Sequence, residues 1–489
     1  MMGVDKRLIV AVCILTFDIL LLVTAWSFSG VDLTDDVKVF VGAGKQATLD
    51  TTHGFMTSID SSWELKPLGN RVLYYFVVIA AGAFHTNPDI CLKMLALSAL
   101  VVIALLFAIE VTRRFPGVEP ADADFAFAFV SIAMLTVANL FFMQAEWWAV
   151  LLSFAVLWML LTKKYALVGI AGLLSVWIIF MKLSTLMLIP SIFAAYILLE
   201  GVIHRETIIA YATGFLAGLA FVATWLVYLP HAVPDMFLSI QLARATKGID
   251  IQTVDGLNYL LFYTINNILN APVIGIGLVA LMILFILLVV MRINKGEEVI
   301  AYCVKTLIIL FFLWGAPLAS ILAQNEFFSY HYTILVFPAV ITVLVTIGNA
   351  TMPLRLEGAT AAIVAIFAIW FMMNSLWSPL YAQQDAFWKG TANDSELFQE
   401  RYDLSGEILY LDISSATYYL DAKSACRMVG SLPIERKLTW TTEYAENLAC
   451  IENYQGTYAV AKHGSGMPSL LPNYTKIEEG TSWDLYARN

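Results

Sequence analysis

The chain has 489 residues, of which 60% are hydrophobic and only 13% are charged, and its mean hydropathy is +0.76. This composition excludes an ordinary water-soluble protein and predicts that most of the chain is solvated by lipid. The formal net charge of −10 comes without any basic stripe, so nucleic acid is not an expected partner.

The first apolar segment, residues 8–28, follows the basic pair Lys6-Arg7. Secretory signal sequences share this arrangement, but residues 24–28 are too bulky for a cleavage site, which requires small residues. We therefore expect this segment to remain in the protein as its first membrane span.

Ten later apolar segments are long enough to cross the membrane as helices. Together with the first, they predict an α-helical polytopic membrane protein of about eleven transmembrane helices. The ten segments are residues 90–111, 122–143, 147–162, 165–181, 184–200, 207–229, 271–291, 300–323, 330–348 and 359–378.

The segment 68–84 decides the topology, because it is apolar but short and directly follows Pro67. If it lies in the membrane interface, nearly all the short basic loops fall on one side; if it crosses, most of them move outside. The positive-inside rule favours the interfacial placement, with the N-terminus cytoplasmic and the C-terminus outside the plasma membrane. The basic loops contain Arg113-Arg114, Lys163-Lys164, His204-Arg205, Arg292, Lys295 and Arg355.

Three segments are then expected outside: loop 29–89, loop 230–270 and the polar tail 379–489. Residues 1–378 would form the transmembrane catalytic domain, and the tail a small extracytoplasmic α/β domain. Within the tail, residues 406–412 and 456–461 are typical of short strands, and residues 440–453 of a helix.

The tail also contains two cysteines and two glycosylation sequons. Cys426 and Cys450 either form a disulfide, which would imply an oxidising compartment, or remain two free thiols. The sequons are Asn393-Asp394-Ser395 and Asn473-Tyr474-Thr475, which matter only where the host glycosylates external proteins.

Loop 29–89 begins with the carboxylates of Asp32, Asp35 and Asp36, where the first span reaches the external surface. Asp36 precedes Phe40 by four residues, so the two share a face if the segment is helical. A carboxylate there can take a proton from an acceptor hydroxyl or hold a divalent cation, Mg²⁺ or Mn²⁺. The alternative is that the aspartates only mark the end of a span in water.

Three cations stand at predicted external positions: Lys66 and Arg71 on either side of Pro67, and Lys182 between the fifth and sixth spans. Cations at headgroup depth can bind a phosphate, Arg through a bidentate fork and Lys as a point charge. The alternatives are side chains that snorkel to ordinary lipid headgroups and, for Lys182, a simple turn residue.

Glu146 follows the third span and is also expected on the external face, where it could complete a metal or acceptor site. Tyr330 and His331, at the external mouth of the late spans, could contact sugar or phosphate oxygens. The alternative for both places is a polar turn within an aromatic belt. No HxxxH or CxxC spacing supports a zinc site.

These residues resemble the GT-C superfamily of integral-membrane glycosyltransferases, in particular the branch of protein O-mannosyltransferases and bacterial aminoarabinose transferases. In that branch the first external loop carries an acidic pair, typically Asp-Glu-x-x-Tyr, and Glu-x-Lys-Pro-Pro-Leu leads an interfacial helix. Residues 35–40 (DDVKVF) and 64–68 (ELKPL, beginning at Glu64) stand at these places. Glu146 stands where the family has an acidic residue after the third span, and Tyr330-His331-Tyr332 leads to a late proline, Pro338.

The chain also departs from the family pattern. No Glu follows Asp36, Phe40 replaces the Tyr, Leu68 replaces the second proline, and Glu146 replaces the usual Asp. The acidic residue at position 36 is retained, whereas the departures weaken the assignment of a metal.

The resemblance implies transfer of a sugar from a polyprenyl- or dolichyl-phosphate donor to a glycan, lipid or protein acceptor on the external face, with inversion. Asp36 would be the general base, Lys66 and Arg71 would bind the leaving lipid phosphate, and Glu146 would position the acceptor or a cation. The main rival is a membrane transporter or lipid flippase, which would predict ionisable residues near mid-span and matched broken helices.

Overall fold

A computed structural model of the chain describes residues 35–49, 68–115, 120–141, 143–235, 272–293, 299–324, 329–349, 379–412, 416–428 and 437–489, and a few single residues between them. Contacts between residues divide the chain into two compact units. The first unit comprises Met1–Asp32, Leu95–Phe221 and Ile249–Trp377. The second comprises Leu33–Met94, Val222–Gly248 and Ser378–Asn489.

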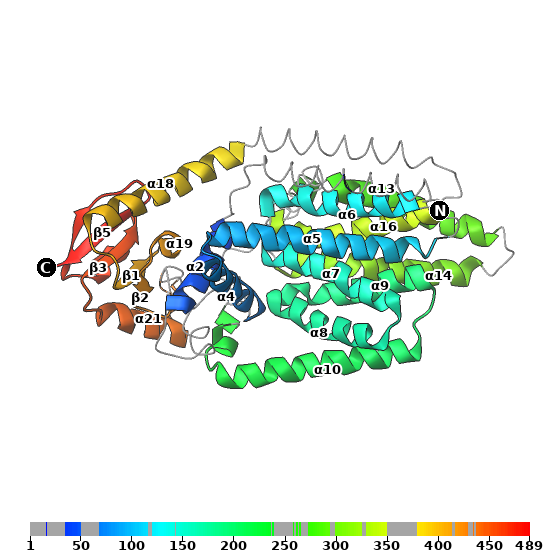
Figure 1. The fold of residues 1–489 in the computed structure, drawn as a ribbon, viewed down its shortest axis with the longest axis horizontal. Helices are drawn as coiled ribbons and strands as arrows, with labels where there is room; N and C mark the ends of the chain where they lie inside the picture. The colour runs from blue at the N-terminus through cyan, green and yellow to red at the C-terminus, as the bar shows by residue number, and fades with distance from the viewer. Residues whose placement is uncertain are drawn as a thin grey trace, which may run out of the picture. The chain divides into compact units, whose positions relative to one another are not determined.

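The described part of the first unit is helical, and its long helices run side by side (Figure 1). Helices that lie wholly or mainly in this unit are α5 (Pro88–Thr112), α6 (Pro120–Phe141), α7 (Ala145–Thr162), α8 (Tyr165–Met181), η1 (Leu183–Met187), α9 (Leu188–Glu200), α10 (Arg205–Tyr228), α13 (Pro272–Ile293), α14 (Val299–Leu310), η2 (Phe311–Gly315), α15 (Ala316–Gln324), η3 (Ser329–Leu335) and α16 (Val336–Asn349).

Seven helical stretches in the described part of the chain are long and apolar enough to cross a membrane. They differ in burial: 78% of the α7 window and 89% of the His331–Asn349 window are buried, against 22% in α10. Helices α7 and α16 are therefore central in the bundle, and α10 offers most of its apolar surface to lipid. Nine predicted spans coincide with described helices. Segments 8–28 and 359–378 lie, save for Thr16, outside the described residues, so the total of eleven stays a prediction.

The segment 68–84 forms α4 (Leu68–Ala83), which packs against α2 (Asp35–Leu49) in the second unit. The rings of Phe40 and Tyr74 are 5.4 Å apart, and a Cβ on Gly44 would lie 2.7 Å from the Tyr74 carbonyl oxygen. At 16 residues, α4 is roughly 24 Å long, shorter than the ~30 Å of a bilayer core.

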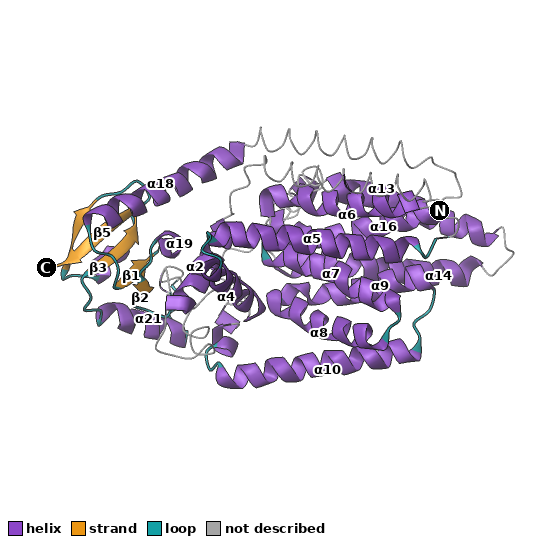
Figure 2. Ribbon diagram, in the orientation of Figure 1, coloured by secondary structure: helices purple, strands orange, loops and turns teal. Residues whose placement is uncertain are grey.

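The tail forms the predicted α/β domain, and it holds every strand in the described part of the chain (Figure 2). A five-stranded sheet has the order β2-β1-β3-β5-β4, in which β2, β1 and β3 are parallel and β5 and β4 antiparallel to their neighbours. Its elements are α18 (Pro379–Arg401), β1 (Glu407–Leu411), α19 (Ala416–Tyr419), β2 (Lys423–Ser424), α21 (Thr442–Glu452), β3 (Tyr458–Lys462), η4 (Met467–Leu470), β4 (Tyr474–Glu478) and β5 (Trp483–Arg488).

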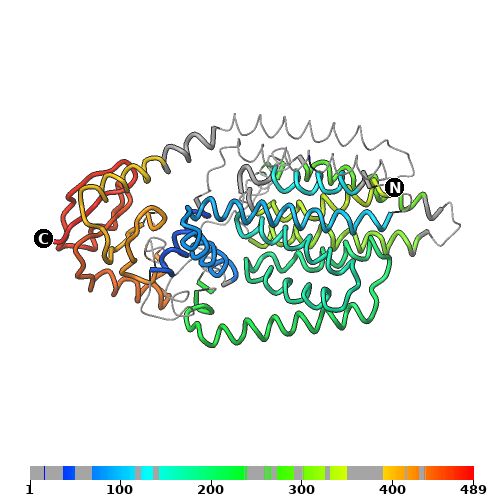
Figure 3. The backbone as a smooth tube through the Cα atoms, in the orientation of Figure 1, coloured from blue at the N-terminus to red at the C-terminus, as the bar shows by residue number. Residues whose placement is uncertain are grey.

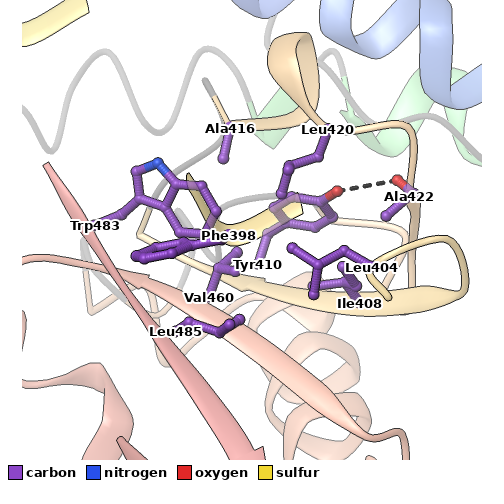
Figure 4. Packing of buried hydrophobic residues seen from close by; sticks show 10 residues of the cluster. All are labelled: Phe398, Leu404, Ile408, Tyr410, Ala416, Leu420, Ala422, Val460, Trp483 and Leu485. Atoms are coloured by element: carbon purple, nitrogen blue, oxygen red, sulfur yellow. Dashed lines mark hydrogen bonds between the residues drawn. The ribbon is translucent and has the colours of Figure 1, made fainter. Parts of the chain in front are cut away.

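Both faces of this sheet are covered by apolar side chains. Successive side chains of a strand point to opposite faces, so β1 contributes to both. Ile408 and Tyr410 of β1 point to one face, where they pack with Phe398 of α18 and Trp483 of β5 (Figure 4). Leu409, which lies between them in β1, points to the other face and packs there with other apolar side chains, including Ile451 of α21. The predicted strands 406–412 and 456–461 and helix 440–453 are confirmed as β1, β3 and α21.

Cys426 and Cys450 form a disulfide. The sequence left open whether they are bridged or free, and the structure has the bridge. The bond joins the segment after β2 to α21, across 24 residues. A bridge of this kind is typical of proteins that fold in an oxidising compartment.

The tail also holds α2, far away in the sequence but in the same unit (Figure 3). The side chain of Gln46 donates to the Ala422 carbonyl oxygen at 2.8 Å and accepts from the Ser424 N–H at 2.6 Å. Lys45 pairs with Asp421 at 2.6 Å. Helix α2, which begins at Asp35 and includes Asp36, therefore belongs to the same compact unit as the C-terminal domain.

Ion pairs join the ends of three helices at one end of the first unit. Arg114, just after α5, pairs with Glu110 at 2.8 Å and with Glu200 at the end of α9. Lys163, at the end of α7, pairs with the same Glu200. Helices α5, α7 and α9 therefore end at one face of the bundle.

Helices α8 and α10 cross at glycines. A Cβ on Gly214 of α10 would overlap the backbone of Gly169 in α8. Small residues allow such close approach of helices in membranes.

We predict that Gly214→Ala destabilises the protein by about 1–3 kcal/mol, because the added methyl forces two backbones apart. Gly82→Ala is the control, since no atom lies within 4 Å of a Cβ built there. Thermal unfolding of both variants in detergent measures the effect. A Gly214→Ala variant as stable as Gly82→Ala would show that the crossing is looser than described.

Candidate functional site

A charged cluster lies in the first unit at the N-terminal end of α7. The Glu146 carboxylate accepts a hydrogen bond from the ammonium group of Lys182, and His331 Nε2 lies 4.0 Å from the same carboxylate oxygen. The side chains of Glu146 and His331 are 1% and 0% exposed, and that of Lys182 is 15% exposed. These groups are three of the predicted site residues, and the structure brings them together.

Local structure explains the positions of Glu146 and Lys182. Glu146 is in the first turn of α7, where the partial positive charge of a helix N-terminus favours an anion. Lys182 is extended between α8 and η1, and its carbonyl oxygen accepts from the Thr185 N–H at 3.0 Å. Trp147, next to Glu146, donates its indole N–H to the Met134 carbonyl oxygen at 3.1 Å. The start of α7 is thus fixed against α6.

The electrostatics of the cluster follow from its burial. A buried carboxylate is costly to ionise unless a cation accompanies it, and Lys182 supplies that cation. Glu146 Oε2 is buried and makes no hydrogen bond among the described residues, so one acceptor of this carboxylate is unused by the described part of the chain.

The described surroundings of Glu146 do not fit a divalent metal. Mg²⁺ and Mn²⁺ prefer several oxygen ligands, whereas the groups found beside this carboxylate are an ammonium and an imidazole.

The other predicted residues are placed as follows. Asp35 and Asp36 open α2, but their side chains are outside the described part. Glu64 and Lys66 precede the described residues, and the side chain of Tyr330 is not described. Only Arg71, among the site residues predicted in the first loop, has a described side chain.

Arg71 belongs to a second ionic cluster, within the second unit. Its guanidinium donates to the Asp235 carboxylate at 3.0 Å, and Arg427 donates to both oxygens of that carboxylate at 2.9 and 3.0 Å. The Asp235 side chain is 1% exposed. One carboxylate between two guanidinium groups leaves a net positive charge, which Glu446, 3.8 Å from Arg427, offsets from an exposed position.

Local sequence patterns do not point to Asp235 and Arg427. Asp235 is a single acid after Pro234 in a polar loop, and Arg427 lies in the tail, 356 residues after Arg71. The neighbouring Cys426 was the one hint that this segment is fixed.

A further cluster lies in the tail. Among the described residues, His463, Glu479 and Asp484 form the group of possible metal ligands that lie close together. Lys476 Nζ is 3.2 Å from Asp484, and a cation at that distance repels a metal ion. The cluster is better described as a surface ion-pair network, in which the hydrogen bond from His463 Nδ1 to the Asp484 carboxylate raises the pKa of His463.

We predict a pH dependence from His463. Because its pKa in the folded state lies above the unfolded value of about 6.5, its contribution to stability is present below that pH and is lost as the pH rises through the folded-state pKa. The thermal unfolding midpoint of wild type and His463→Gln, measured in detergent against pH, should differ at low pH and converge at high pH. A constant difference would contradict the shift.

We also predict that Lys182→Met destabilises the protein by about 3–5 kcal/mol, since it leaves the Glu146 carboxylate buried without its cation. The double variant Lys182→Met/Glu146→Gln should recover part of the loss. Lys164→Met, at the exposed opposite end of α8, is the control. Chemical or thermal unfolding in detergent gives the comparison, and equal stability of the two lysine variants would mean that the buried pair contributes nothing.

No family model matches the sequence, and no curated protein matches it either. Solved structures of an oligosaccharyltransferase from Archaeoglobus fulgidus are similar in part. The apo form is 12% identical, with 92% of this chain and 69% of that chain covered and a TM-score of 0.47. The form tethered to an acceptor peptide is 13% identical, with 94% and 69% covered and a TM-score of 0.49. The AglB complex with an inhibitory peptide and a dolichol-phosphate is 14% identical, with 92% and 69% covered and a TM-score of 0.43. At these values the likenesses establish neither a shared fold nor a shared activity.

Proposed function

We propose that the protein is an integral-membrane glycosyltransferase of GT-C type. It transfers a sugar from a polyprenyl- or dolichyl-phosphate donor to an acceptor hydroxyl at the external membrane face. The observation that carries this proposal is the buried Glu146–Lys182 pair, with His331 beside it, at one end of an apolar helix bundle. A protein that only anchors a domain in the membrane does not require such a cluster. An enzyme that acts on polar substrates at headgroup depth does.

Asp36 is the proposed general base. It stands in the first turn of α2, and the N-terminus of a helix stabilises a carboxylate as the anion that a base must be. The contacts of Gln46 and Lys45 with the tail fix the same helix, which supports a role that needs a positioned side chain.

The reaction is an inverting displacement at the anomeric carbon. The acceptor oxygen forms a bond to that carbon while its proton passes to the Asp36 carboxylate. The bond between the anomeric carbon and the phosphate oxygen breaks, and the lipid phosphate leaves with the electron pair. A cation beside that phosphate stabilises the developing charge.

Lys66 is the favoured phosphate ligand among the three predicted cations. The guanidinium of Arg71 pairs with buried Asp235, and the ammonium of Lys182 pairs with Glu146, so each of these cations already has a carboxylate partner. We assign Arg71 mainly to the fold of the second unit. The role proposed for Glu146 is to position the acceptor, and Lys182 balances the charge of that carboxylate.

The distribution of charge weighs against the rival class of transporters and flippases. In the described helices of the bundle, charged residues occur only in the first or last two turns. A transporter that carries ions or polar solutes is expected to have ionisable groups near the bilayer midplane. The proposed transferase needs them only at the membrane surface.

The test uses purified protein in lipid nanodiscs and a panel of labelled polyprenyl-phosphate sugars. We expect wild type and Asp36→Asn to bind the same donor, and slow release of free sugar to fall about 10²–10⁴-fold in the variant, as for loss of a general base. Asp35→Asn is the matched control and should retain most of the release.

Two outcomes would contradict the proposal. Equal release by Asp36→Asn and wild type would remove Asp36 from its role as base. Failure of every such lipid to bind would remove the donor class, and vesicle transport assays would then test the rival.

A further inference from the structure

The two sequons of the tail differ in their structural setting. Asn473 lies in the exposed turn before β4, and Thr475, the hydroxyl residue of its sequon, is exposed. In β4 the backbone of Thr475 pairs with Ala487, while the side chain of Thr475 remains on the surface. Both the Asn473 and the Thr475 side chains are therefore accessible on the surface of the folded domain.

The sequon of Asn393 lies inside α18. The Asn393 side chain is exposed, but Ser395 is 2% exposed and donates its hydroxyl to the Thr391 carbonyl oxygen at 2.7 Å. Asp394 between them is 4% exposed and accepts from the N–H groups of Thr481, Ser482 and Trp483 at 3.0, 2.7 and 3.2 Å. To present this sequon, the protein would have to open α18 away from the sheet.

We propose that Asn473 is an N-glycosylation site of the folded protein and that Asn393 is not. In the modification, a bond forms between Asn473 Nδ2 and the anomeric carbon of a lipid-linked glycan. The bond from that carbon to the lipid's phosphate oxygen breaks, the phosphate leaves with the electron pair, and a base of the modifying enzyme takes the amide proton.

The position of Asn473 gives the glycan a physical role. Strand β4 is at the end of the described sheet, next to β5 on one side only. An unpaired strand edge can recruit a strand from another molecule, and a bulky, hydrated glycan at the first residue before β4 obstructs that approach.

The proposal rests on the predicted extracytoplasmic placement of the tail and is independent of the transferase activity. It is tested on full-length protein made without glycosylation, purified in detergent and incubated with a purified oligosaccharyltransferase and its lipid-linked oligosaccharide. Mass spectrometry then gives the occupancy of each sequon, in folded protein and in protein that has been reduced and unfolded.

The sequons differ in their third residue, so Thr475→Ser supplies the matched control in which both end in serine. We expect at least about tenfold higher occupancy of Asn473 than of Asn393 in the folded protein, because local opening limits access to the second. The ratio should approach one after unfolding of Thr475→Ser. Asn473→Gln should remove the glycan from the folded protein.

Equal occupancy in the folded protein, or a preference that persists after unfolding, would overturn the structural argument. Protein made in cells that N-glycosylate external domains should carry a glycan on Asn473. A bare Asn473 in such cells would overturn the external placement of the tail and this proposal with it, whereas the activity of Asp36 is judged separately by the nanodisc assay.

Discussion

The carboxylate of Asp235 is buried between the guanidinium groups of Arg71 and Arg427, and these three residues come from the three separate segments of the second unit. A carboxylate that is 1% exposed needs such partners to offset the cost of removing its charge from water. Each segment therefore depends on the others: removal of Asp235 leaves two guanidinium groups facing each other, and removal of either arginine loses the ion pair that joins its segment to Asp235. This shared carboxylate adds to the contacts of Gln46 and Lys45 that join the first segment to the tail.

Charge is sorted to the two ends of α7, and this separation organises the first unit. Glu146 stands at one end with Lys182 and His331, and Lys163 at the other end pairs with Glu200. The 18 residues of α7 span about 27 Å, close to the ~30 Å thickness of a bilayer core. One end is rich in cations and suits the cytoplasmic side under the positive-inside rule. The other end holds the Glu146–Lys182 pair, in which the two charges balance.

Much of the fold could be predicted, since nine spans and three elements of the tail depend on local hydrophobic periodicity alone. The edge hairpin of β4 and β5 was missed, because residues 474–478 carry Lys476 and Glu478 and do not alternate cleanly. At the candidate site, Glu146, Lys182 and His331 could be named because each follows or precedes a span. Asp235 and Arg427 could not, because their partnership depends on contacts between residues 192 positions apart, which no local pattern records.

The contacts of Gln46 with Ala422 and Ser424 join residues 376 and 378 positions apart. At a synthesis rate of ~5–20 residues per second, about 20–75 s pass between the emergence of the first partner and the last. During that interval α2 lacks the backbone groups that Gln46 binds, and Arg71 and Asp235 lack Arg427. The second unit is therefore incomplete until the tail has left the ribosome, and a chain that stops before the tail is expected to be a substrate for membrane proteases.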